Sequence, residues 1–119
     1  MKLLVVEDEM MVAMLIEDML DELGFEPPLC AVTLDQALDL AAANPVDAAV
    51  LDVNLNGAES FPVADLLREK RTPFIFSTGY GRQGIPDRFK ETQTLQKPFR
   101  VEELRAALEA LKVRETPSS

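Results

Sequence analysis

Residues 48–57 read AAVLDVNLNG, and this stretch decides the fold. Four apolar residues in a row, Ala48 to Leu51, are typical of a short strand that is buried on both faces of a parallel sheet. Asp52 ends the run, and residues Asn54 to Gly57 are typical of a turn. A carboxylate therefore stands at the carboxyl end of a buried strand, which is where open parallel sheets hold their ligands.

Two further apolar runs end in a similar way. Leu3 to Val6 leads directly into the acidic pair Glu7 and Asp8, and the run that begins at Phe74 is followed by Thr78. Between these runs, apolar residues recur at the spacing of helices rather than of strands. The alternation predicts an α/β fold, a doubly wound, five-stranded parallel sheet with helices on both faces.

Four helices and two weaker strands complete the expected pattern. The helices are expected over residues 10–23, 34–43, 60–70 and 101–111, and the weaker strands over residues 25–32 and around Leu95. The segment 79–93 is the least patterned because it contains Gly81, Gly84 and Pro86, and we expect its helix to be short or frayed. One domain is expected over residues 1–114, followed by a disordered tail over residues 115–119.

The composition excludes several classes of protein. One cysteine, Cys30, and no histidine rule out a disulfide framework, a zinc site and a histidine-based catalytic triad. The formal net charge of −9 argues against nucleic acid or an anionic membrane as a partner and fits a bound cation. No apolar run approaches the roughly 20 residues that span a bilayer, and the N-terminal MKLLVV is too short for a signal peptide, so we expect a cytoplasmic protein.

The polar residues at the strand ends suggest one particular chemistry. Carboxylates from separate strands, here Glu7, Asp8 and Asp52, can converge on one divalent cation, and Mg²⁺ prefers oxygen ligands. Thr78 and Lys97, a lysine that precedes a proline, would suit a phosphoryl group beside them. The set predicts a Mg²⁺-assisted phosphoryl-transfer site with an aspartate as acceptor.

Taken singly, each of these residues has a plainer interpretation. Acidic residues such as Glu7 are common at helix N-termini, and an aspartate such as Asp52 commonly starts a turn. A single threonine in a strand or a single lysine is more often structural or solvated than functional. The site hypothesis therefore depends on these residues occurring together at the ends of strands.

Four segments carry a resemblance to a known family. They are LLVVEDE at 3–9, AVLDVNLNG at 49–57, PFIFSTGYG at 73–81 and QKPF at 96–99. With these motifs in this order, the chain resembles a response-regulator receiver domain from Lys2 to about Val113. The resemblance implies the flavodoxin-like receiver fold, with strand order 2-1-3-4-5.

The resemblance also implies a role for each site residue. Asp52 would be the phosphoacceptor, and Thr78 and Lys97 would bind the phosphoryl oxygens. The Mg²⁺ ligands would be Asp52, Asp8 directly, Glu7 mainly through water, and the backbone carbonyl of Asn54. A cis peptide bond at Lys97-Pro98 is expected as well, since only an X-Pro bond adopts that geometry at low cost. The phosphodonor would be a histidine kinase or a histidine phosphotransfer protein.

Several positions depart from the commonest family pattern. Thr94 stands where an aromatic switch residue is common, and Asn56-Gly57 replaces a methionine-proline turn. The FSTGYG segment, with Gly79 after the threonine, resembles a subgroup of stand-alone receivers with an F-A-T-G-(Y)-G-like motif. We therefore hypothesise that Tyr80, or the stretch 79–93, carries the signalling movement.

The expected function is a stand-alone phosphoacceptor rather than an enzyme. It would act as a phosphorylation-switched adaptor with a downstream protein target, or as a sink that drains phosphoryl groups from a shared kinase. Asn54 and Tyr80, each two residues past a site residue, are expected to tune the phosphoryl lifetime that separates these roles.

Three alternatives belong to other classes. A Mg²⁺-dependent aspartyl phosphatase would need a second acid two residues past Asp52, where the chain has Asn54. A flavodoxin-like cofactor binder would need a phosphate loop after the first strand, where the chain has acids. A phosphate-independent pseudo-receiver would keep the fold without the chemistry.

Overall fold

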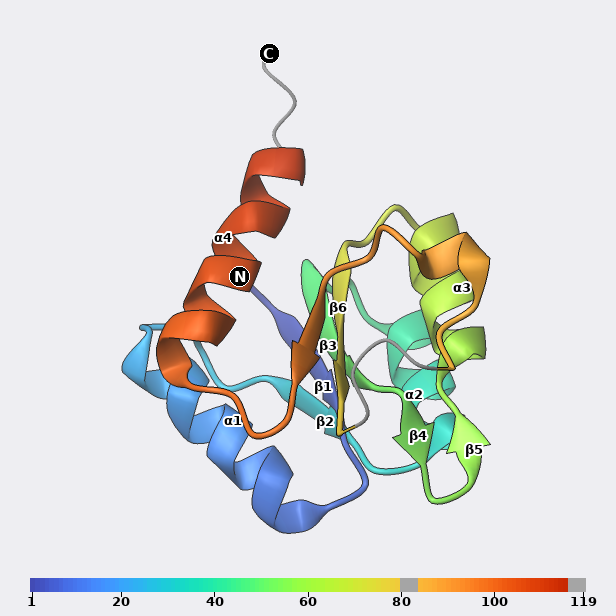
Figure 1. Ribbon diagram of the computed structural model, residues 1–119, viewed down its shortest axis with the longest axis horizontal. Coiled ribbons are helices and arrows are strands. Elements are labelled where there is room, and N and C mark those ends of the chain that lie inside the picture. Colours follow the sequence, from blue (N-terminus) through green and yellow to red (C-terminus); the bar gives the residue numbers. More distant parts are fainter. Residues whose placement is uncertain (80–83, 116–119) are drawn as a thin grey trace.

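The computed structural model describes residues 1–79 and 84–115 of the chain. Five strands form one parallel sheet in the order β2-β1-β3-β6-β7 (Figure 1). These strands are β1 (Leu3–Val6), β2 (Leu29–Ala31), β3 (Ala48–Asp52), β6 (Phe74–Thr78) and β7 (Thr94–Gln96). Counted along the chain, the order is 2-1-3-4-5, so the predicted topology is confirmed.

Four α-helices cover the two faces of the sheet. They are α1 (Met10–Glu22), α2 (Leu34–Ala43), α3 (Phe61–Glu69) and α4 (Val101–Glu115). Figure 1 shows α1 and α4 on one face and α2 and α3 on the other. Helix α4 includes Glu115, the first residue of the expected tail, and residues 116–119 lie outside the described part.

The side chains of each strand alternate between two hydrophobic layers. Leu3 and Val5 of β1 pack into the cluster under α1 and α4. Leu4 and Val6 pack into the cluster under α2 and α3. Because every position of β1 is buried, its sequence is a continuous apolar run rather than an alternating one.

The second strand is shorter than the sequence pattern suggested. The pattern predicted a strand over residues 25–32, but β2 covers only Leu29–Ala31. Pro27 and Pro28 precede it, and proline has no N–H to donate to the neighbouring strand. Pairing with β1 therefore begins at Leu29.

The turn after Asp52 is a hairpin. β4 (Asn54–Leu55) and β5 (Ala58–Glu59) pair antiparallel, and the two-residue connection is Asn56-Gly57. Both connecting residues have positive φ, 57° for Asn56 and 92° for Gly57. An Asn-Gly pair is favoured in two-residue hairpin turns because both positions need left-handed backbone conformations.

The weakly patterned segment contains little helix in its described part. Between residues 84 and 93 the structure has one 3₁₀ turn, η1 (Asp87–Phe89). Phe89 of this turn is fully buried, with ring centroids of Phe61, Phe74 and Phe76 at 5.4 to 5.9 Å. A single aromatic side chain thus anchors a segment that has almost no regular secondary structure.

We predict that Phe89→Ala destabilises the fold by about 3–5 kcal/mol, the usual cost of truncating a buried phenylalanine. Chemical denaturation followed by far-ultraviolet circular dichroism measures this cost. Arg88→Ala is the comparison variant. It removes the exposed ion pair with Asp65 and the contact of the guanidinium with the Phe89 ring, and should cost about 1 kcal/mol. Equal small losses in both variants would show that Phe89 does not anchor the segment.

Candidate functional site

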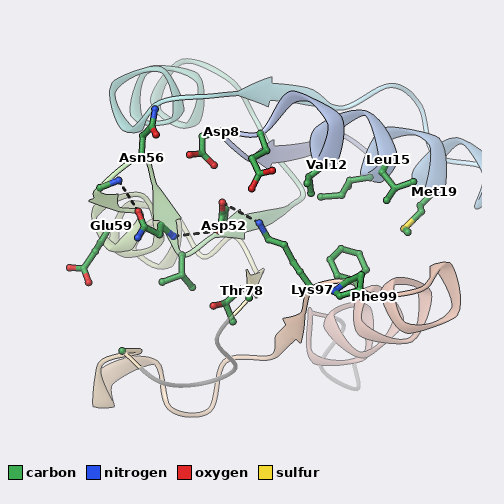
Figure 2. A pocket seen from close by; sticks show the side chains of 18 residues that line it. Asp8, Val12, Leu15, Met19, Asp52, Asn56, Glu59, Thr78, Lys97 and Phe99 are labelled. Carbon is green, nitrogen blue, oxygen red and sulfur yellow. Dashed lines mark hydrogen bonds and ion pairs between the residues drawn. The ribbon is translucent and has the colours of Figure 1, made fainter.

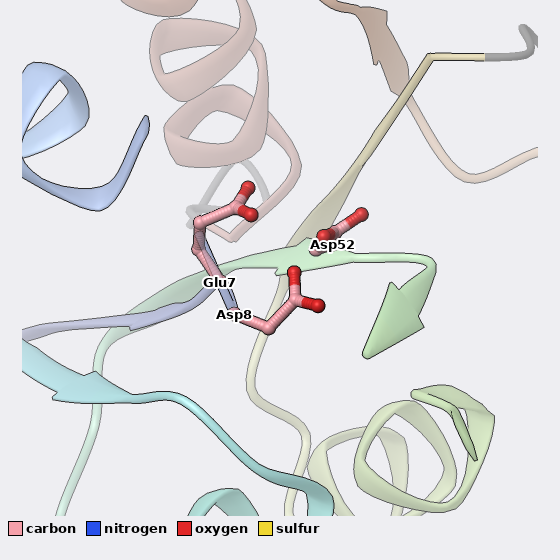
Figure 3. A group of neighbouring side chains, drawn as sticks. All are labelled: Glu7, Asp8 and Asp52. Carbon is pink, nitrogen blue, oxygen red and sulfur yellow. The ribbon is translucent and has the colours of Figure 1, made fainter. Parts of the chain in front are cut away.

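Two neighbouring strands deliver the three predicted carboxylates to one end of the sheet. Glu7 and Asp8 directly follow β1, and Asp52 is the last residue of β3, the next strand in the sheet. One carboxylate oxygen from each of these residues lies within 4.8 Å of the others (Figure 3). The structure therefore brings together the three acidic residues that the sequence suggested as metal ligands.

The three acids differ in their exposure to solvent. Glu7 and Asp52 are buried, at 1% and 6% exposed, and Asp8 is half-buried. The backbone N–H of Glu9 donates to Glu7 Oε2 at 3.1 Å and orients that carboxylate. These carboxylate oxygens are of the ligand type that Mg²⁺ prefers. Their negative charge also exceeds the positive charge around them, which fits a divalent cation.

Lys97 supplies the positive charge that faces the acids. Its Nζ lies 3.3 Å from Asp52 Oδ2 (Figure 2). The same Nζ lies 2.8 Å from Glu7 Oε1. The backbone N–H of Lys97 donates to the Thr78 carbonyl at 2.8 Å, which fixes where the side chain leaves the sheet. The Lys97-Pro98 peptide bond is cis, as expected.

The pKa values reflect this crowding of charge. Burial, followed by the charge of Glu7, raises the pKa of Asp52 to about 7, and Lys97 only partly opposes the shift. Burial works against a charged Lys97, but its hydrogen bond to Glu7 and the charge of Asp52 outweigh burial and raise its pKa. The unloaded site therefore holds a cationic lysine and more carboxylate than that lysine can neutralise.

Thr78 and Asn54 lie beside Asp52 in the same cleft. Thr78 is the last residue of β6 and is buried, and Asn54 begins the hairpin. The Asn54 N–H lies 3.4 Å from Asp52 Oδ1, while its side-chain Oδ1 accepts from the Gly57 N–H at 2.8 Å. The metal contact of the Asn54 carbonyl stays a prediction. Tyr80 lies outside the described residues, and Gly79 lines the cleft.

The cleft extends beyond the polar residues. It has a volume of about 870 Å³ and joins the acidic end to an apolar arm. Val12, Leu15 and Met19 of α1 form one wall of this arm, and Phe99 lies opposite them (Figure 2). Space for an apolar group thus lies next to the candidate acceptor.

The hairpin is a part of the site that the sequence analysis missed. Asn56, Gly57 and Glu59 all line the cleft. The Asn-Gly pair was a usable signal, since it favours two-residue hairpins, but the short flanking strands gave no pattern of their own. The residues after Asp52 therefore form a paired wall of the cleft instead of a simple turn.

The family model of the response regulator receiver domain matches residues 3–109 of the chain. The chain belongs to this family. Receiver domains belong to two-component signalling systems. In this receiver domain the acidic cluster of Glu7, Asp8 and Asp52 is the group that could hold a divalent cation.

Solved structures and curated relatives agree with this assignment. SdrG from Sphingomonas melonis Fr1 is 41% identical with a TM-score of 0.84, over 94% of this chain and 96% of SdrG. The receiver domain of the sensor histidine kinase PA1611 from Pseudomonas aeruginosa PAO1 is 27% identical with a TM-score of 0.77, over 92% and 94%, and holds a magnesium ion in its active-site cleft. A probable chemotaxis protein CheY from Rhizobium etli is 26% identical over 117 residues, which are 92% of this chain and 91% of that protein.

The receiver domain also matches parts of longer proteins. It spans about half the length of two other curated relatives, both of which are transcriptional regulatory proteins. Among the described residues, no helix is both long and apolar enough to cross a membrane.

We predict that the cation-free receiver domain loses stability as the pH rises from about 4 to about 7. Because folding raises the pKa of Asp52, the folded state binds this proton more tightly, and the stabilisation is present below the unfolded pKa and lost above the folded one. Asp52→Asn removes this titration, so at pH 8 without divalent cations the variant should be more stable by on the order of a few kcal/mol.

Thermal denaturation of both proteins at pH 5 and pH 8, with EDTA or with Mg²⁺, measures the effect. Mg²⁺ should stabilise the wild type more than the variant at pH 8, because the cation neutralises the ionised carboxylates. A wild type that is as stable as Asp52→Asn at pH 8 in EDTA would contradict the raised pKa.

Proposed function

We propose that this receiver domain accepts a phosphoryl group on Asp52 from a phosphohistidine of a histidine kinase or a histidine phosphotransfer protein. One observation carries the proposal. The acceptor carboxylate shares a single lysine with Glu7, within reach of a third carboxylate, at the carboxyl end of a parallel sheet. A nucleophilic carboxylate, a cation site and a fixed ammonium are the groups that phosphoryl transfer needs.

The chain's own groups account for the transfer. An Asp52 oxygen attacks phosphorus, an O–P bond forms, the P–N bond to the histidine breaks, and its electron pair stays on the imidazole. Lys97 lies close enough to Asp52 to turn from the carboxylate to the phosphoryl oxygens, and Thr78 borders the same space. Mg²⁺ held by Glu7, Asp8 and Asp52 would neutralise charge on the transferring group.

Two relatives support the cation and the phosphoryl group. The PA1611 receiver domain holds Mg²⁺ in its active-site cleft, and the acidic cluster here offers ligands of the same type. SdrG, which is 41% identical in sequence to this chain, has also been solved in a BeF₃-activated conformation. The TM-score between this chain and that structure is 0.78. We infer that the loaded state of this domain can be reached with the same phosphoryl mimic.

The apolar arm of the cleft supports a protein as the phosphodonor. A phosphohistidine on a helix brings neighbouring apolar side chains with it, and Val12, Leu15 and Phe99 lie beside the acceptor to receive them. The PA1611 receiver is itself part of a sensor histidine kinase, which fits a donor of this class.

A turnover enzyme is less well supported than a phosphoacceptor. The position where an aspartyl phosphatase needs its second acid holds Asn54, and the Oδ1 of Asn54 is engaged by the Gly57 N–H. We therefore propose that only self-catalysed phosphorylation and dephosphorylation occur. The lifetime of the acyl phosphate then decides between an adaptor, which needs persistence, and a phosphate sink, which needs rapid turnover.

We predict that the purified protein gains one phosphoryl group from acetyl phosphate only when Mg²⁺ is present. Intact-mass spectrometry over time measures the gain, and Asp52→Asn is the control that should show none. After removal of the donor, rapid loss of the added mass would favour a sink and slow loss an adaptor. If neither acetyl phosphate nor a phosphorylated histidine phosphotransfer protein added a phosphoryl group, the protein would be a phosphate-independent pseudo-receiver.

A further inference from the structure

Four polar residues form a row across the sheet at its carboxyl end. Val5, Val50, Ile75 and Leu95 all pack on the face covered by α1 and α4. Side chains two residues apart on a strand share a face, so the next positions on this face are Glu7, Asp52, Ser77 and Lys97. Three of these four are the ion-paired residues of the site, and the fourth is Ser77.

The register places Ser77 directly beside the acceptor. Ser77 of β6 is the pairing partner of Asp52 on β3. Lys97 follows β7, on the other side of β6, and still reaches Asp52 and Glu7. The stem of Lys97 must therefore cross β6 on the face that carries Ser77.

The Ser77 hydroxyl is buried without a partner. Ser77 is 1% exposed, and its Oγ has no hydrogen bond among the residues that the structure describes. Its main chain is paired, since its carbonyl accepts the Val53 N–H at 3.0 Å. Buried hydroxyls are normally hydrogen-bonded, so one that lacks a partner next to a reactive group calls for an explanation.

We propose that Ser77 is a positioning residue whose hydroxyl donates to Asp52 when the acceptor is loaded. The inference rests on the proposed function. In the unloaded site Lys97 holds Asp52 Oδ2, and Asn54 N–H lies at 3.4 Å from Oδ1. Once phosphorus is bound, Lys97 moves to the phosphoryl oxygens. The Asp52 oxygen that does not carry phosphorus, which would still face the cation, then loses its hydrogen-bond donor. Ser77 is the neighbouring side chain that can replace it by rotation about one bond.

The hydroxyl of Ser77, rather than its volume, carries this role. Alanine would fill the same buried space with no polar atom to satisfy. Thr78, the next residue, lies on the opposite face of β6 by alternation, so the two hydroxyls approach the acceptor from different sides of the sheet.

The test compares binding of fluoroberyllate, a phosphoryl mimic, with Mg²⁺ to the full chain by isothermal titration calorimetry. Ser77→Ala should leave the melting temperature of the unloaded protein unchanged or raised and weaken fluoroberyllate binding about three- to tenfold, as expected for one lost hydrogen bond. Ser77→Thr keeps the hydroxyl and should restore the affinity.

Ser60→Ala is the matched control. Ser60 precedes α3, is fully buried and also has an Oγ without a partner in the described structure, but it is not a strand-pairing neighbour of Asp52 as Ser77 is. It should behave like Ser77→Ala in the unloaded state and like the wild type toward fluoroberyllate. If Ser77→Ala folds poorly, Ser77→Cys, which is close in volume and a weak donor, replaces it.

The outcomes separate the two proposals. A wild type that binds no fluoroberyllate and takes no phosphoryl group overturns the proposed function. A wild type that binds, with Ser77→Ala binding equally well, overturns the role of Ser77 alone. A lower melting temperature of unloaded Ser77→Ala with unchanged affinity would likewise show that the hydroxyl serves only the fold.

Discussion

Repulsion among the carboxylates at the end of the sheet is the constraint on which the site depends. Glu7 and Asp52 are almost fully buried, and both face the single ammonium of Lys97. Charged groups are not buried together unless something offsets the loss of hydration and their mutual repulsion. The raised pKa of Asp52 shows that Lys97 does not offset them completely. The unloaded site is therefore under electrostatic strain, and a divalent cation or a change in protonation relieves it.

The parallel sheet is what can hold such a strained group of charges. Adjacent strands fix the spacing of their carboxyl ends, and two hydrophobic layers hold the strands in register. β1 and β3 are buried along their whole length, so moving their ends apart would disrupt the core on both faces. Burial of apolar surface thus stabilises an arrangement that electrostatics alone would disperse. Because the carboxylates are already held close together, less free energy is lost in ordering them when a cation binds.

Sequence patterns predicted the parts of the structure that depend on local chemistry. The continuous apolar runs identified β1, β3 and β6, and the residue after each run identified the acids and Thr78. Sequence patterns did not predict the contacts between segments that are distant in the chain. Phe89 anchors a segment rich in turn residues only because three phenylalanines from elsewhere surround it, and β2 is short because Pro27 and Pro28 break its pairing. The unpaired hydroxyl of Ser77 is likewise a property of its neighbours, since no sequence pattern distinguishes it from a strand serine with a partner.

The order of charges along the chain links completion of the fold to completion of the site. Between Lys2 and Arg68 the sequence contains no lysine or arginine, so β1 and β3 bring acids to their carboxyl ends with no cation from this part of the chain. Lys97 follows β7, the edge strand that adds last along the chain. Its backbone N–H bonds to Thr78, and its ammonium bridges Glu7 and Asp52. Pairing of β7 therefore completes the sheet and also brings in the ammonium that partly neutralises the acids. A change that loosens β7 should weaken the acceptor site even where no site residue is altered. Among the residues that the structure describes, Lys97 is the cation paired with these carboxylates, and the pairing of β7 holds it in place.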